Sequence, residues 1–147
     1  MKKNNKGFSL VELIVVVLIM AIIAVALAPQ VMKWVENSRK STDCNNYDSV
    51  VSAVNIALAN EDVMSKIGTT GYTLTWPNSN GSQWSVSGGT DNAAALKNAI
   101  AATLGSTWDA DLKVKRTTDF GSANYEIKVD ANGTVQRKCA PSSDSIS

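Results

Sequence analysis

The residues best suited to chemistry in this chain lie close to its start, and they are few. Lys6 and Gly7 precede Phe8, and one carboxylate, Glu12, follows about one helical turn later. Glycine has no side chain, so a protease can approach the backbone closely at Gly7. Cleavage of the Gly7–Phe8 bond frees an α-amino group near the Glu12 carboxylate. A cut at this bond would therefore leave a positive amine at the start of a helix, with a carboxylate about one turn away.

Two cysteines, Cys44 and Cys139, are the other reactive side chains, and they stand 95 residues apart. No C-x-x-C pair occurs, which argues against a redox dithiol or a zinc ribbon. In a protein outside the cytoplasm, two lone cysteines normally pair. A bridge that closes so long a loop stabilises a fold by about 4–5 kcal/mol in the chain-entropy model. A Cys44–Cys139 disulfide is therefore the expectation, and two free buried thiols are the alternative.

Catalytic chemistry finds little support in the sequence. The chain contains no histidine, which removes the commonest general base, proton shuttle and zinc ligand. It shows no phosphate-binding glycine loop, no paired-carboxylate site and no nucleophile arrangement. The stretch Asp130–Gly133 holds possible calcium ligands, but Asp and Asn favour turns in any case, so a plain turn is preferred. We predict a protein that is not an enzyme and has neither a metal nor a cofactor.

Composition and charge point away from nucleic acid as a partner. The 147 residues suit one globular domain, with a net charge of +1. Without the first seven residues, 11 basic side chains face 13 acidic ones. Such a chain has no strong positive field to attract nucleic acid. No specific nucleic-acid partner is predicted.

An uncharged run from Leu13 to Ala28 must position the N-terminal groups. Counted from Phe8, the apolar segment has 21 residues, so as a helix it is about 31 Å long, close to the thickness of bilayer hydrocarbon. The basic leader should stay in the cytoplasm. A secretory signal peptide ending at 26–28 is one alternative. A plain anchor is another, but it leaves Glu12 unexplained, because charges beside membrane segments are costly and usually functional. The non-functional explanation of Glu12 is that its side chain reaches out of the membrane to the polar interface.

The segment Lys6–Leu13 (KGFSLVEL) resembles the processing motif of type IV prepilins and related pseudopilins, and the resemblance covers roughly residues 1–45. It implies that a membrane prepilin peptidase cuts after Gly7 and methylates the new N-terminus, Phe8. It also implies that Glu12 is the acidic fifth residue of the mature chain, which we expect to set the register between subunits. Pro29 falls near a proline common in the family, where it permits a kink or local melting.

The remaining pattern predicts an α+β protein: a long N-terminal helix, membrane-spanning in its first half, packed on a small antiparallel sheet. Helices are expected from Phe8 to Asn60, fraying to Ile67, and over Thr90–Leu104, capped by Thr90 or Asp91. Strands are expected at Tyr72–Trp76, Gln83–Val86, Leu112–Lys115, Tyr125–Val129 and Thr134–Arg137. We divide the chain into a leader (1–7), a membrane and filament-core helix (8–28), its extension (29–67) and a head (68–147). The ladle-shaped fold of the pilin family has the same plan.

The resemblance implies a structural function. The chain would be stored in the cytoplasmic membrane as a single-pass precursor, then assembled with copies of itself into a cell-surface type IV pilus for motility, adhesion or DNA uptake. A prepilin peptidase, an assembly ATPase and a platform protein would be its partners. The alternatives are a pseudopilin of a type II secretion or competence machine, and a monomeric membrane-anchored binding module that uses its tryptophans or basic pairs.

Overall fold

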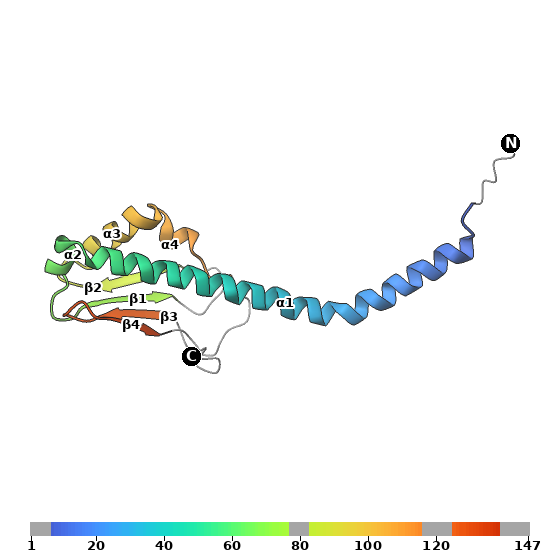
Figure 1. The fold of residues 1–147 in the computed structure, drawn as a ribbon, viewed down its shortest axis with the longest axis horizontal. Helices are drawn as coiled ribbons and strands as arrows, with labels where there is room; N and C mark the ends of the chain where they lie inside the picture. Colours follow the sequence, from blue (N-terminus) through green and yellow to red (C-terminus); the bar gives the residue numbers. More distant parts are fainter. Residues whose placement is uncertain (1–6, 77–82, 116–124, 139–147) are drawn as a thin grey trace. The chain divides into compact units, whose positions relative to one another are not determined.

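The computed structural model describes residues 7–76, 83–115 and 125–138 (Figure 1). Its helices are α1 (Leu10–Leu58), α2 (Glu61–Ser65), α3 (Ala94–Leu104) and α4 (Trp108–Asp111); its strands are β1 (Tyr72–Trp76), β2 (Ser85–Gly88), β3 (Tyr125–Val129) and β4 (Val135–Lys138). The chain forms two compact units, which meet between Asn37 and Ser38, within α1.

The first unit is the N-terminal part of α1, a helix that is apolar on every side. From Leu10 to Val35 every side chain is exposed, although almost all of them are hydrophobic. A soluble helix keeps a polar face toward water, whereas this stretch carries Glu12 as its single charged residue before Lys33. Its backbone bonds are made within the helix, as a lipid environment requires. The apolar surface of this unit is therefore suited to contact with lipid or with other apolar helices rather than with water.

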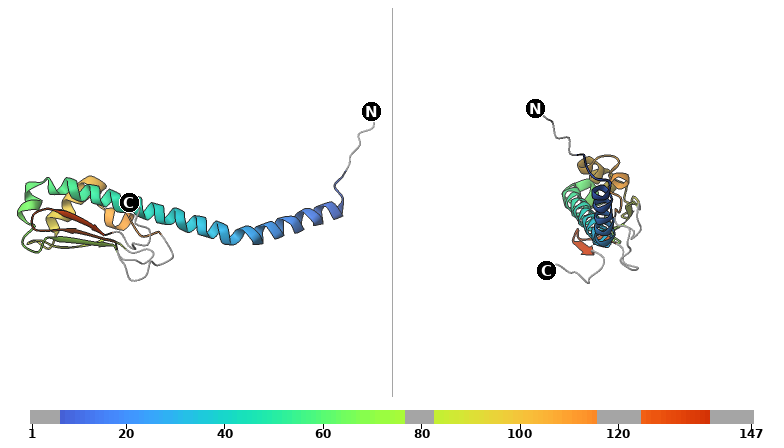
Figure 2. Two further views of the ribbon diagram at one scale, coloured as in Figure 1. Left: turned by 60° about the horizontal axis from the view of Figure 1, so that its bottom comes forward. Right: turned by 90° about the vertical axis from the view of Figure 1, so that its right-hand side faces the viewer.

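The second unit is built on a four-stranded antiparallel sheet with the strand order β2-β1-β3-β4. The C-terminal part of α1 lies over one face of this sheet (Figure 2). Alternation in β1 turns Tyr72, Leu74 and Trp76 toward the helix, and all three are buried. The helix contributes a matching apolar stripe of buried residues: Tyr47, Val50, Val51, Ala53, Val54 and Ala57. The core of this unit therefore lies between α1 and the sheet, joined by Leu96 and Ile100 of α3.

Aromatic rings fill one end of this core. Trp76 stacks on Trp84 with their centroids 5.0 Å apart, and it contacts Tyr125 at 5.3 Å. Tyr47 of α1 lies 5.4 Å from Tyr125, and Trp108 of α4 lies 6.4 Å from Trp84. Such pairs add about 0.5–1.5 kcal/mol each beyond the area they bury. These tryptophans are core residues, so they offer little ring surface to a ligand.

The α+β architecture predicted from the sequence is confirmed, but four elements differ. β2 covers Ser85–Gly88 rather than Gln83–Val86. Leu112–Lys115 is not a strand, although it alternates like one. α1 ends at Leu58, and α2 is a separate helix with Asn60 as its N-cap. α3 starts at Ala94 rather than Thr90, yet the Asp91 carboxylate still accepts a hydrogen bond from the Ala95 N–H (2.7 Å).

The Leu112–Lys115 prediction was wrong because a side chain, not a neighbouring strand, takes the backbone hydrogen bond. The Lys115 N–H donates to Oδ1 of Asp43 on α1, at 2.8 Å. Asp43 is fully buried, the one buried charged residue in the part of the chain that the structure describes. Val114 beside it is also buried. Asp43 therefore fixes this segment to α1 in a conformation that strand propensity does not predict.

Replacing Asp43 tests this anchor. We expect Asp43→Leu to lower the free energy of unfolding by about 1–3 kcal/mol, because the Lys115 N–H loses its acceptor inside the protein. Asp43→Asn keeps an oxygen acceptor in the same place and should cost clearly less. Urea unfolding of both variants measures the difference; equal losses would show that the hydrogen bond to Lys115 is unimportant.

Candidate functional site

The bond expected to be cut lies in an accessible stretch before α1. Gly7 and Phe8 are both exposed and non-helical, and Phe8 has 88% of its surface exposed. A methyl group placed on Gly7 would meet no atom within 4 Å. The side of the Gly7 backbone on which a Cβ would lie is therefore open to a protease. Lys6 and the rest of the leader lie outside the described residues.

Glu12 is held by the start of its own helix. The Ser9 N–H donates to Oε2 of Glu12 at 3.3 Å, and the Leu13 N–H donates to the Ser9 carbonyl at 3.2 Å. Ser9 stands immediately before Leu10, the first helical residue, so Ser-x-x-Glu has the spacing of a capping box. A carboxylate in the first turn is also favoured by the helix dipole. Our sequence prediction missed this role of Ser9, although the spacing signalled it.

The helix that follows is long and apolar enough to cross a bilayer. Its most apolar window of 18 residues has a mean hydropathy of 3.2, and none of that window is buried. Pro29 lies inside α1 without ending it. Proline removes one helical hydrogen bond, so the helix is locally weaker there. The exposed bond, the capped carboxylate and the apolar rod form one continuous segment.

The sequence of this segment matches the family described as the prokaryotic N-terminal methylation motif, over residues 2–28. This prepilin-type motif indicates the type IV pilin and pseudopilin superfamily. For this pilin-like protein, the motif implies processing by prepilin peptidase and makes the N-terminal part of α1 a membrane-spanning anchor. Proteins of this family are typically structural rather than enzymatic. Neither the comparison with curated proteins nor that with solved structures gave a match.

In the second unit, the end of β4 contacts α1 at Tyr47 and Asp48. The Tyr47 hydroxyl donates to the Glu126 carbonyl at 3.1 Å, and Glu126 stands opposite Lys138 in the antiparallel β3–β4 pair. Arg137 forms an ion pair with Asp48 and lies 5.7 Å from the centre of the Tyr47 ring. The end of β4 is thus held against α1 by contacts with Tyr47 and Asp48.

Cys44 lies one helical turn before Asp48 and is exposed. Its expected partner, Cys139, directly follows Lys138 in the sequence and lies outside the described residues. The structure thus brings the end of β4 to the turn of α1 next to Cys44.

The described residues hold no cluster of three or more metal-ligating side chains. In the β3–β4 connection, Oδ1 of Asp130 accepts hydrogen bonds from the backbone N–H groups of Asn132 (3.0 Å) and Thr134 (2.8 Å). This carboxylate oxygen therefore closes the turn, as Asp commonly does.

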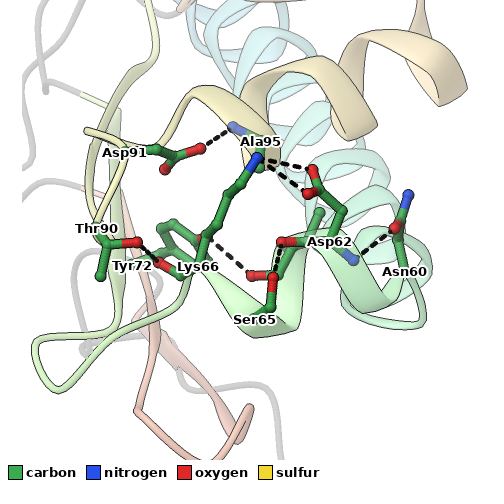
Figure 3. A network of polar contacts seen from close by, with 9 residues as sticks. Asn60, Asp62, Ser65, Lys66, Tyr72, Thr90, Asp91 and Ala95 are labelled. Atoms are coloured by element: carbon green, nitrogen blue, oxygen red, sulfur yellow. Dashed lines mark hydrogen bonds and ion pairs between the residues drawn. The ribbon is translucent and has the colours of Figure 1, made fainter.

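A polar network joins α2, β1 and the start of α3 (Figure 3). Lys66 forms an ion pair with Asp62 at 3.0 Å, and the Thr90 hydroxyl donates to the Lys66 carbonyl at 3.2 Å. The buried Tyr72 hydroxyl donates to the Val63 carbonyl at 3.0 Å. Burial, followed by the negative charges of Asp91 and Asp62, raises the pKa of Tyr72 above its ordinary value near 10. The network therefore favours the neutral phenol in the folded state.

This raised pKa predicts a loss of stability in alkali. The folded protein holds the Tyr72 proton more tightly than the unfolded chain, so the contribution is complete below about pH 10 and is lost as the pH rises further. Tyr72→Phe should cost about 0.5–1.5 kcal/mol at neutral pH, because it removes one hydrogen bond. The stability of this variant should also fall less steeply at alkaline pH than that of the unmodified protein. Thermal unfolding between neutral and strongly alkaline pH measures both effects, and parallel curves for the two proteins would contradict the prediction.

Proposed function

We propose that this chain is a structural subunit of a type IV pilus, cut between Gly7 and Phe8, methylated on Phe8, stored in the membrane and assembled into an extracellular filament. The observation that carries the proposal is the apolar rod from Phe8 to Val35. It is exposed on every side and follows directly on the processing motif. Lipid covers such a rod during storage, and copies of the same rod cover it in a filament.

Transfer from lipid to filament gains little hydrophobic energy, because both surroundings are apolar. Close packing and specific polar contacts must then direct assembly. Cleavage exposes the Phe8 amine, and Glu12 is the nearest carboxylate. In a stack of staggered helices, the Glu12 of one subunit meets the amine of another. Such a pair adds little net stability, but a mismatch leaves a buried charge alone at a cost of about 3–5 kcal/mol. Glu12 thereby sets the register.

Pro29 fits the same scheme as a weak point in the rod. The N–H missing at Pro29 leaves one carbonyl of the preceding turn without its helical partner. A helix that can bend or melt there can follow its neighbours in a filament while the rest of the rod stays helical. We propose that this is the function of Pro29.

We further propose that a Cys44–Cys139 disulfide ties the sheet to α1. Arg137 faces α1, where it meets Asp48. One turn of helix, from Asp48 back to Cys44, covers about 5.4 Å. The Arg137–Asp48 ion pair therefore attaches the end of the described strand about one helical turn from Cys44, and this contact supports the proposed bridge.

Mass spectrometry of intact surface filaments tests the function directly. The expected subunit begins at Phe8, carries a methyl group on its N-terminal amine and is the main component of long filaments. A subunit that retains residues 1–7, or that lacks the whole apolar stretch, would contradict the proposal. A processed chain found only as a minor component of a secretion or uptake machine would make it a pseudopilin instead.

A further inference from the structure

We propose that Glu12 and Trp34 mark the two faces of the bilayer in the stored subunit, and that Lys33 and Trp34 bind phospholipid headgroups on the outer face. The proposal rests on membrane storage, which is part of the proposed function, but it does not depend on filament assembly. Its partner is the phosphate and glycerol layer of a phospholipid membrane.

The spacing of charges along α1 fits one bilayer. Glu12 and Lys33 are consecutive charged residues, with only uncharged residues between them. The helix from Glu12 to Trp34 rises by 22 residues, or about 33 Å at 1.5 Å per residue. The hydrocarbon layer is about 30 Å thick. A helix centred in the bilayer therefore places Glu12 in one headgroup layer and Trp34 in the other.

The side chains at the outer end suit that layer. Trp34 is 60% exposed, and the indole ring, apolar with one N–H donor, is enriched at membrane interfaces. Lys33 is exposed beside it, so its ammonium can reach the lipid phosphates while its stem lies along the apolar surface. The other three tryptophans are buried in the core of the second unit. Trp34 therefore differs from the other three tryptophans, because its ring has no protein core around it and suits the membrane interface.

This placement gives Glu12 two different environments. In storage, its carboxylate lies among headgroups and water, where it caps the helix through the Ser9 N–H. The cost of burying the charge then falls only on extraction into a filament. The Gly7–Phe8 bond also lies on the cytoplasmic side, within reach of a peptidase at the membrane surface. Storage and processing need no buried partner for Glu12, whereas assembly does.

Tryptophan quenching tests the membrane position with the full-length chain in phosphatidylcholine–phosphatidylglycerol vesicles. Nitroxide labels are placed on the lipid headgroup, near the glycerol, or at the end of the acyl chain. We expect headgroup and glycerol labels to quench Trp34 clearly more than the chain-end label does. The Trp34→Phe variant should lose this depth-dependent quenching, because the three remaining tryptophans are buried in the core.

Substitutions at Lys33 separate headgroup binding from simple hydrophobic depth. Lys33→Leu should move Trp34 inward, seen as a rise in chain-end quenching, while Lys33→Arg keeps the positive charge and the shallow position. Strongest quenching by the chain-end label, no quenching by any lipid label, or unchanged quenching in Trp34→Phe would each overturn the proposal. None of these results measures filament formation, so the pilus function would fail separately, in the mass analysis of filaments.

Discussion

Glu12→Val will leave the pilin-like chain inserted and processed, and it will abolish filaments. Without the carboxylate, each Phe8 amine that enters the filament core is a buried charge without a partner. That cost is about 3–5 kcal/mol for each contact, which lowers the assembly constant roughly a hundredfold to a few thousandfold. Membrane fractions report insertion, the mass of the stored subunit reports cleavage, and electron microscopy of sheared surface material reports filaments.

Glu12→Gln is the matched control, because the structure shows a second role for the carboxylate. Glutamine at this position also completes a capping box, so it can accept the hydrogen bond of the Ser9 N–H but carries no charge. If charge pairing sets the register, Gln and Val variants both fail to assemble. If Glu12 serves only as a cap, the Gln variant builds normal filaments, and the register proposal is then wrong. Ser9→Ala, which leaves the backbone N–H in place, should assemble.

Breaking the proposed disulfide should cost the second unit about 4–5 kcal/mol of unfolding free energy, the chain-entropy value for a loop of this length. Cys44→Ser, Cys139→Ser and the double variant should lose the same amount, since each removes one and the same bond. Denaturant unfolding of the full chain in detergent, with and without reductant, measures the loss, and thiol titration of the unfolded protein counts free cysteines. Two titratable thiols in unreduced protein would refute the bridge.

Arg137→Ala separates the bridge from the contacts beside it. The ion pair of Arg137 with Asp48 is exposed at both side chains, so its loss should cost at most about 1 kcal/mol. A reductant should still destabilise this variant by the full disulfide contribution. If Arg137→Ala alone matched the effect of Cys44→Ser, then packing of β4 on α1, rather than a covalent bond, would explain the stability.

The N-terminal part of this protein can be predicted from sequence because its chemistry is contiguous. The expected cleavage bond, the amine that it would free at Phe8, and Glu12 lie within about one helical turn of one another, and an uncharged run follows directly. The rise per residue of a helix and the thickness of a bilayer then predict that this run spans a membrane. The capping contact of Ser9 with Glu12 is equally local. Its Ser-x-x-Glu spacing is visible in the sequence, but our sequence prediction did not include it.

The sequence by itself determined the apolar rod, its processing motif and the α+β class, because each depends on neighbours along the chain. Only the tertiary structure decided that Leu112–Lys115 is no strand, since the acceptor of the Lys115 N–H lies 72 residues away. It also decided the strand order β2-β1-β3-β4 and the aromatic end of the core. Such contacts join segments distant in sequence, and alternation or propensity within one segment carries no information about which partner it will meet.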